Sequence, residues 1–99
     1  MTDFEKRVYE IVRTIPYGNV MSYSDIGTIL GNPKLARAVG NALHKNPDPE
    51  NTPCFRVVHS DGSLCDSFAF GGIDEQRYLL EAEGVKIVDN KVVSIAYKK

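Results

Sequence analysis

A tight turn at Gly31-Asn32-Pro33 constrains the fold of this chain most, because only two residues separate the helical stretches on either side of it. Ser22 and Asp25 match a capping box, with aspartate in place of the usual glutamate or glutamine, and predict a helix over residues 23–30 that the glycine ends. The asparagine suits an N-cap and the proline a first helical position, which predicts a second helix over residues 33–44. Two short helices joined in this way predict a helix-turn-helix.

Two further helices are expected on either side of this unit. Apolar residues from Phe4 onward recur at helical spacing and predict a helix over residues 3–14. A last helix is expected over residues 74–83 and is ended by Gly84. The expected apolar face of that last helix consists of Tyr78, Leu79 and Ala82.

Short β elements complete the prediction. Residues 56–59 are β-prone, residues 60–62 form a turn, and residues 63–64 return as a short strand, which together predict a small hairpin or wing. Residues 86–88 and 91–95 predict a second hairpin with a two-residue turn. The expected fold class is mainly α with small β accessories, a winged helix-turn-helix-like domain.

Length and charge limit the classes of function. A chain of 99 residues suffices for one hydrophobic core, so a single domain over residues 1–99 is expected, without a separate cofactor domain. The net charge of −1 excludes a global basic signature, so any contact with nucleic acid depends on a local patch. No signal peptide, membrane span or dimerisation helix is recognisable, which predicts a cytoplasmic monomer without a membrane partner. A disulfide between Cys54 and Cys65 is the minority interpretation.

The second helix of the helix-turn-helix has an unusually slim surface. Leu35, Val39 and Leu43 recur at a spacing of four and form the expected buried seam. The small residues expected on the other side are Ala36, Ala38, Gly40 and Ala42. Such a surface allows close approach to a partner, although close packing between helices is an equally common cause.

A lone thiol, Cys54, lies in the apolar and β-prone run from Pro53 to Val58 and not in a Cys-x-x-Cys pair. This placement favours a nucleophile over a zinc ligand or a disulfide. An ordinary buried cysteine is the alternative, because cysteine packs as a small hydrophobe. His44 and His59 lack a set of ligands at metal-binding spacing, so no metal site is expected.

Several motifs occur in an order that resembles a known family. Residues 32–43, the pair Asn46-Pro47, the Cys54 segment, residues 68–72 and residues 79–84 together resemble the DNA-binding, active-site domain of the O6-alkylguanine-DNA alkyltransferases. These proteins are also called methylated-DNA–protein-cysteine methyltransferases. The resemblance implies binding of double-stranded DNA in the minor groove, flipping of O6-alkylguanine, and irreversible transfer of the alkyl group to cysteine without a cofactor.

The resemblance also implies roles for residues of the helix-turn-helix. Arg37 matches the arginine that takes the place of the flipped nucleotide, and Tyr23 matches the tyrosine that presses on the phosphate next to the lesion. The alternatives are a solvated surface charge for the arginine and a half-buried aromatic ring for the tyrosine. The expected DNA-binding residues are Tyr23, Lys34, Ala36, Arg37, Ala38 and Gly40.

Activation of the thiol is where the sequence departs from the family. The family motif is Pro-Cys-His-Arg, in which the histidine joins the thiol to a glutamate through water, and here Phe55 replaces it. Phenylalanine cannot relay a proton. Glu83 matches the glutamate and Asn46 matches an asparagine that supports the active-site turn, so the expected catalytic residues are Cys54, Glu83 and Asn46. The residues expected around the lesion are Pro53, Phe55, Val57, Phe68, Phe70, Gly71 and Gly72.

Three functional hypotheses follow. In the first, Cys54 accepts the alkyl group despite Phe55. In the second, the chain only binds the lesion, as alkyltransferase-like proteins do, and hands it to excision-repair proteins. The third, a winged-helix transcription regulator, is disfavoured because the second helix offers small residues where major-groove readers carry long polar side chains.

Overall fold

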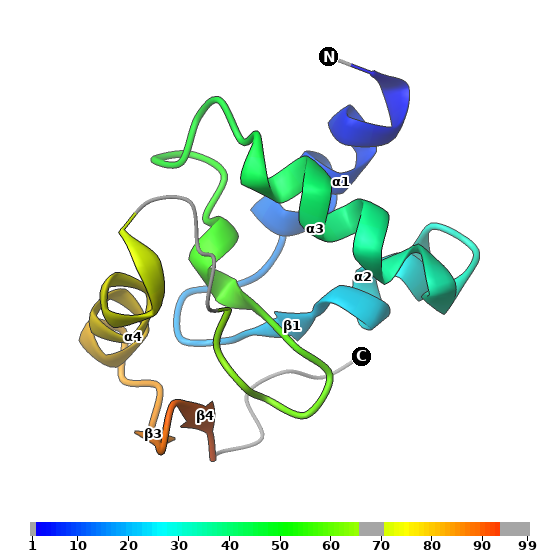
Figure 1. Ribbon diagram of the computed structural model, residues 1–99. Helices are drawn as coiled ribbons and strands as arrows, with labels where there is room; N and C mark the ends of the chain where they lie inside the picture. The colour runs from blue at the N-terminus through cyan, green and yellow to red at the C-terminus, as the bar shows by residue number, and fades with distance from the viewer. Residues whose placement is uncertain (1, 66–70, 94–99) are drawn as a thin grey trace.

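The computed structural model describes residues 2–65 and 71–93, and over these residues the chain is mostly helical (Figure 1). The helices are α1 (Asp3–Arg13), α2 (Tyr23–Ile29), α3 (Ala36–His44) and α4 (Gly72–Ala82), with 3₁₀ turns η1 (Pro33–Leu35) and η2 (Cys54–Arg56). The strands are β1 (Met21–Ser22), β2 (Val57–Val58), β3 (Ile87–Val88) and β4 (Lys91–Val92). The predicted mainly helical fold with small β accessories is confirmed.

Local capping rules fix where α2 begins. Ser22 Oγ accepts from the backbone N–H of Asp25 at 3.0 Å, and Asp25 Oδ2 accepts from the N–H of Ser22 at 3.2 Å, which confirms the predicted capping box. The turn that follows is packed very closely, since a Cβ on Gly27 would lie 2.8 Å from the carbonyl oxygen of Asn32. Asn32 caps the next segment, but that segment starts as the 3₁₀ turn η1, and the α-helix begins only at Ala36.

The predicted wing differs from the observed strands. β2 pairs in parallel with β1, with Met21 opposite Val57 and Ser22 opposite Val58, and not in a hairpin with residues 63–64. Residues 54–56 form η2 and contribute no strand. The reason is burial: both valines of β2 have no exposed surface, so this strand lies inside the domain and not in a wing at the surface. The predicted turn over residues 60–62 is present, since the carbonyl oxygen of Ser63 accepts from the N–H of His59 at 3.0 Å, and Ser63 also forms a bridge to Lys91.

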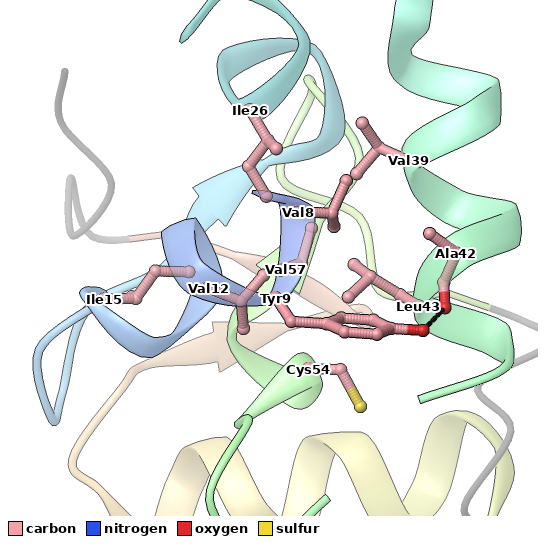
Figure 2. Packing of buried hydrophobic residues seen from close by; sticks show 10 residues of the cluster. All are labelled: Val8, Tyr9, Val12, Ile15, Ile26, Val39, Ala42, Leu43, Cys54 and Val57. Atoms are coloured by element: carbon pink, nitrogen blue, oxygen red, sulfur yellow. Dashed lines mark hydrogen bonds between the residues drawn. The ribbon is translucent and has the colours of Figure 1, made fainter. Parts of the chain in front are cut away.

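The core has two clusters that meet at β2. The first lies between α1, α2, α3 and η2 and contains Val8, Tyr9, Val12, Ile15, Ile26, Val39, Ala42, Leu43, Cys54 and Val57 (Figure 2). The second contains Val20, Val58, Leu64, Leu80 and Val85. Consecutive residues of β2 therefore enter different clusters, as the alternation of side chains along a strand requires.

Two predicted helix faces need correction. Ala42 lies in the first cluster and not on an outer surface, and its carbonyl oxygen accepts from the Tyr9 hydroxyl at 2.7 Å. On α4, Tyr78 is 65% exposed, whereas Gln76 and Leu80 are completely buried. Ala82 is exposed as well. Gln76 is buried because its amide satisfies backbone groups of three other residues, a contact that apolar periodicity does not reveal.

The C-terminal predictions hold for the residues that the structure describes. Gly84 follows α4 with a φ of 88°, and Asp89 and Asn90 have φ values of 53° and 59°, as a two-residue turn of the primed type requires. β3 and β4 pair in an antiparallel manner. The predicted continuation to residues 94–95 lies outside the described residues. Among the helices described, none is long and apolar enough to cross a membrane.

Candidate active site

Cys54 is the first residue of η2 and lies at the edge of the first cluster, beside the Tyr9 ring (Figure 2). Only 6% of the residue is exposed. Burial raises the pKa of the Cys54 thiol, and the Asn46 side chain opposes this effect. The neutral thiol is therefore the stable form near neutral pH, and the local field is not that of an activated thiolate.

Asn46 supports the loop that leads into η2. Its Nδ2 donates to the carbonyl oxygen of Thr52 at 2.9 Å, and its Oδ1 accepts from the N–H of Asp48 at 3.0 Å. The same Thr52 carbonyl accepts from the N–H of Cys54 at 2.7 Å. Two of the three predicted catalytic residues, Cys54 and Asn46, thus donate hydrogen bonds to the same carbonyl group.

Glu83 lies in a different set of contacts. Arg56 binds its carboxylate in a bidentate manner, with Nε 3.0 Å from Oε1 and Nη2 2.6 Å from Oε2. The N–H of Gly18 also donates to Oε1 at 3.0 Å. Arg56 further donates to the carbonyl oxygen of Ile15 at 2.8 Å. Because both charged side chains are largely buried, this pair fastens the end of α4 to η2 and to the segment after α1.

Phe55, which the motif comparison in the sequence aligned with a histidine, packs toward the second cluster, while Cys54 belongs to the first. The guanidinium carbon of Arg56 lies 5.4 Å from the centre of the Phe55 ring and 5.8 Å from that of Tyr17. These are cation–π distances. The ring therefore serves packing, and it has no polar group with which to deprotonate the neighbouring thiol.

The other residues expected around the lesion differ in accessibility. Pro53 is buried, and Val57 has no exposed surface, so Val57 is a core residue behind η2. Gly71 and Gly72 have φ values of 125° and 78° and lead into α4. At Gly71 a Cβ would come within 2.6 Å of the Glu75 side chain. Phe68 and Phe70 lie outside the described residues.

The predicted DNA-binding residues lie on or beside α3. Arg37 is exposed, and within residues 2–65 and 71–93 its side chain makes no hydrogen bond or ion pair. Lys34 is exposed on η1, while Ala36, Ala38 and Gly40 are half-buried. A Cβ on Gly40 would lie 3.8 Å from the Tyr23 ring, which is an ordinary contact.

Tyr23 connects this helix surface to the thiol region. Its ring centre lies 5.3 Å from that of His59. Burial raises the pKa of the Tyr23 hydroxyl, and a hydrogen bond with the Cys65 side chain raises it further. Cys65 also contributes to the raised pKa of Cys54, so it belongs to the site region although sequence reasoning gave it no role.

Gln76 is a second residue that sequence reasoning missed. Its Oε1 accepts from the N–H of Cys65 at 2.8 Å, and its Nε2 donates to the carbonyl oxygens of Phe55 and Val57 at 3.1 and 2.9 Å. One completely buried amide therefore joins η2, β2 and the segment before residue 66. A glutamine in a helix ordinarily faces water, so a single sequence carries no signal for this role.

Comparison with known proteins decides the family. The family model described as 6-O-methylguanine DNA methyltransferase, DNA binding domain, matches residues 3–85. The chain belongs to this family. The resemblance found in the sequence is thereby confirmed, and with it membership of a family of DNA-repair alkyltransferases.

The chain matches only part of each relative that carries a methyltransferase name. A methylated-DNA–protein-cysteine methyltransferase of Methanosarcina acetivorans is 40% identical over 83 residues, which cover 84% of this chain and 52% of the relative. The protein of that name from Rattus norvegicus is 37% identical, and the match covers 79% of this chain and 37% of the relative. The chain thus spans about half or less of the length of these curated relatives.

Solved structures of the family include complexes with DNA. The S. pombe Atl1 complex with damaged DNA containing O6-carboxymethylguanine has a TM-score of 0.77 and 39% identity, and the match covers 89% of this chain and 82% of that one. The Mycobacterium tuberculosis OGT complex with DNA has a TM-score of 0.78 and 43% identity, with 85% and 50% covered. Both matches agree with the fold described above.

Proposed function

We propose that this chain binds duplex DNA in the minor groove, flips O6-alkylguanine and accepts its alkyl group irreversibly on Cys54. The observation that carries the proposal is the position of the Cys54 thiol at the head of η2, where Asn46 and the Cys54 N–H share the carbonyl oxygen of Thr52. The DNA complexes of Atl1 and OGT support a DNA partner for a fold of this kind.

The transfer is a displacement at the alkyl carbon. The Cys54 sulfur attacks as thiolate, the bond between the alkyl carbon and O6 breaks, and the electron pair stays on guanine, which takes up a proton. No electrons are gained or lost, so no cofactor is required. Because burial favours the protonated thiol and Phe55 cannot accept its proton, the proton leaves to water. We expect the transfer to be slow at neutral pH and faster as the pH rises.

The DNA-binding residues act before this step. Arg37 fills the space left by the extruded nucleotide, since its exposed side chain has no competing partner in the part of the chain that the structure describes. Tyr23 presses on the adjacent phosphate, Lys34 contacts the DNA backbone, and the small residues of α3 allow close approach to the DNA.

A second set of residues surrounds the flipped base: Pro53, Phe55, Gly71 and Gly72. Val57 supports η2 from the core. Glu83 acts through Arg56 on the position of η2.

A non-catalytic lesion sensor that recruits excision-repair proteins is the second candidate. It is favoured by the raised pKa of Cys54 and by the apolar packing of Phe55, which together leave the thiol without an activating partner. The likeness to Atl1 is consistent with it. In this case DNA binding and base flipping use the same residues, and Cys54 is an ordinary buried cysteine.

Intact-protein mass spectrometry separates the two candidates. The protein is incubated with duplex DNA containing O6-methylguanine, with Cys54→Ala as the control and peptide mapping of the modified residue. One added methyl group on Cys54, absent from the control, establishes transfer. An unchanged mass with preferential binding to the damaged duplex identifies a sensor. An unchanged mass without preference refutes both candidates.

A further inference from the structure

Thr52 lies in the loop before η2 and forms hydrogen bonds with several residues of that loop and of η2. It has no exposed surface, and its N–H donates to the carbonyl oxygen of Asp48 at 2.9 Å. Its own carbonyl oxygen accepts both from Nδ2 of Asn46 and from the N–H of Cys54. The position of this one peptide group therefore sets the position of the thiol-bearing residue and of the amide beside it.

The side chain of Thr52 is held from outside the loop by Arg13. Nε of Arg13 donates to Oγ1 of Thr52 at 2.9 Å, across 39 positions of sequence. Arg13 is the last residue of α1, where a cation is favoured by the helix dipole. Within the described residues, the side chain of Arg13 forms no ion pair with a carboxylate. Its hydrogen bond to Thr52 is the one hydrogen bond that this side chain makes there.

We propose that Arg13 is a positioning residue for the alkyl acceptor: by fixing Thr52, it holds the Asn46 amide and the Cys54 backbone in the arrangement that transfer requires. This inference rests on the proposed transfer to Cys54. The guanidinium does not touch the thiol, and it acts only through the Thr52 carbonyl. A hydrogen bond with a charged donor is among the stronger ones in proteins, which suits a clamp between two separate segments.

The reactivity of the thiol is expected to report this arrangement. The Asn46 side chain opposes the effect of burial on the pKa of Cys54, so a displaced amide leaves that pKa higher still. The titratable groups around Cys54 are Tyr9 from α1, Tyr23 from α2 and Cys65. Burial raises the pKa of both tyrosines above the ordinary value of about 10, so they stay protonated near neutral pH. Replacing Cys65 by serine removes the remaining group.

The experiment compares four single variants, and the double variant Arg13→Met with Thr52→Val, in a Cys65→Ser background. Arg13→Met and Thr52→Val remove the bond, Thr52→Ser keeps the hydroxyl, and Arg7→Met is the matched control, because Arg7 is exposed on the same helix. Two rates are measured as a function of pH: alkylation of Cys54 by iodoacetamide, and methyl transfer from O6-methylguanine duplex in a single turnover.

Arg13→Met and Thr52→Val are each expected to slow both reactions about tenfold at neutral pH and to move the iodoacetamide profile to higher pH. The double variant is expected to be no slower than either single one, because the two residues share one interaction. Thr52→Ser and Arg7→Met should react like the parent protein. DNA affinity should be unchanged in all five variants.

Either of two results overturns the positioning role. One is unchanged iodoacetamide reactivity in Arg13→Met and Thr52→Val. The other is additive losses with an unmoved pH profile, which indicate general loosening of the fold. If the parent protein transfers no methyl group, the proposed function fails, and the iodoacetamide profiles still decide whether Arg13 positions the thiol.

Discussion

Replacing Gln76 by leucine removes a single buried amide that joins three segments of the site region. The substitution leaves three backbone groups without their partner: the N–H of Cys65 and the carbonyl oxygens of Phe55 and Val57. Leucine fills a similar volume, so the loss is mainly one of hydrogen bonds and not of packing.

The magnitude follows from these contacts. A buried group left unsatisfied costs about 1–3 kcal/mol, so three such groups cost about 3–9 kcal/mol in total. This is a large share of the roughly 5–15 kcal/mol that stabilises a domain. At about 4–8 °C per kcal/mol for a chain of this size, the midpoint of thermal unfolding should fall by about 12 °C or more.

The assay is thermal unfolding followed by circular dichroism, with Glu81→Leu as an exposed control on the same helix. The control should change stability by about 0.5 kcal/mol or less. Gln76→Glu adds a test of mechanism, because a carboxylate keeps the acceptor for Cys65 and loses the donor to the two carbonyl groups. Its destabilisation should be smaller at pH 5 than at pH 8, since the protonated acid can donate again. A drop of less than about 4 °C for Gln76→Leu would refute this account of α4.

Four further predictions concern the helix-turn-helix and the thiol. Ser22→Ala removes the capping box and should cost about 1 kcal/mol in urea unfolding; an unchanged midpoint contradicts the role of the cap. Gly27→Ala should destabilise the protein, although alanine is favoured over glycine within a helix by about 1 kcal/mol, because its Cβ would lie 2.8 Å from the Asn32 carbonyl oxygen; a higher midpoint shows that the turn can relax. Because the folded protein holds the Cys54 proton more tightly than the unfolded chain does, stability should fall as the pH rises past the ordinary thiol pKa of about 8.5, and it should fall less in Cys54→Ala. Arg37→Ala should weaken binding to O6-methylguanine duplex in a fluorescence titration while the unfolding midpoint stays the same, and equal binding would show that Arg37 is only a solvated charge.

Local rules explain what the sequence allowed us to predict. The capping box at Ser22, the turn at Asn32 and the hairpin turn at Asp89-Asn90 each depend on residues within a few positions of one another. They therefore hold whatever the rest of the chain does, and they were confirmed. The family motifs likewise indicated the correct family.

The errors arose where distant segments meet. The partner of β2 is β1, far away in the sequence, and the two buried valines of β2 look no different from those of a local hairpin strand. The prediction for the buried face of α4 was wrong in two ways. The largely apolar side chain of Tyr78 is exposed, and the polar side chain of Gln76 is buried, where it forms hydrogen bonds with other segments. For the same reason, no pattern in the sequence could point to the contact between Arg13 and Thr52.

The parallel pairing of β1 with β2 also implies an order of assembly. Helices α2 and α3 are close neighbours along the chain and can meet early, whereas β2 reaches β1 only after a long loop has closed. Because Val57 and Val58 enter different clusters, this single event completes the first cluster and starts the second. We therefore expect the thiol of Cys54 to be open to solvent until the two strands join, and to be buried once they have.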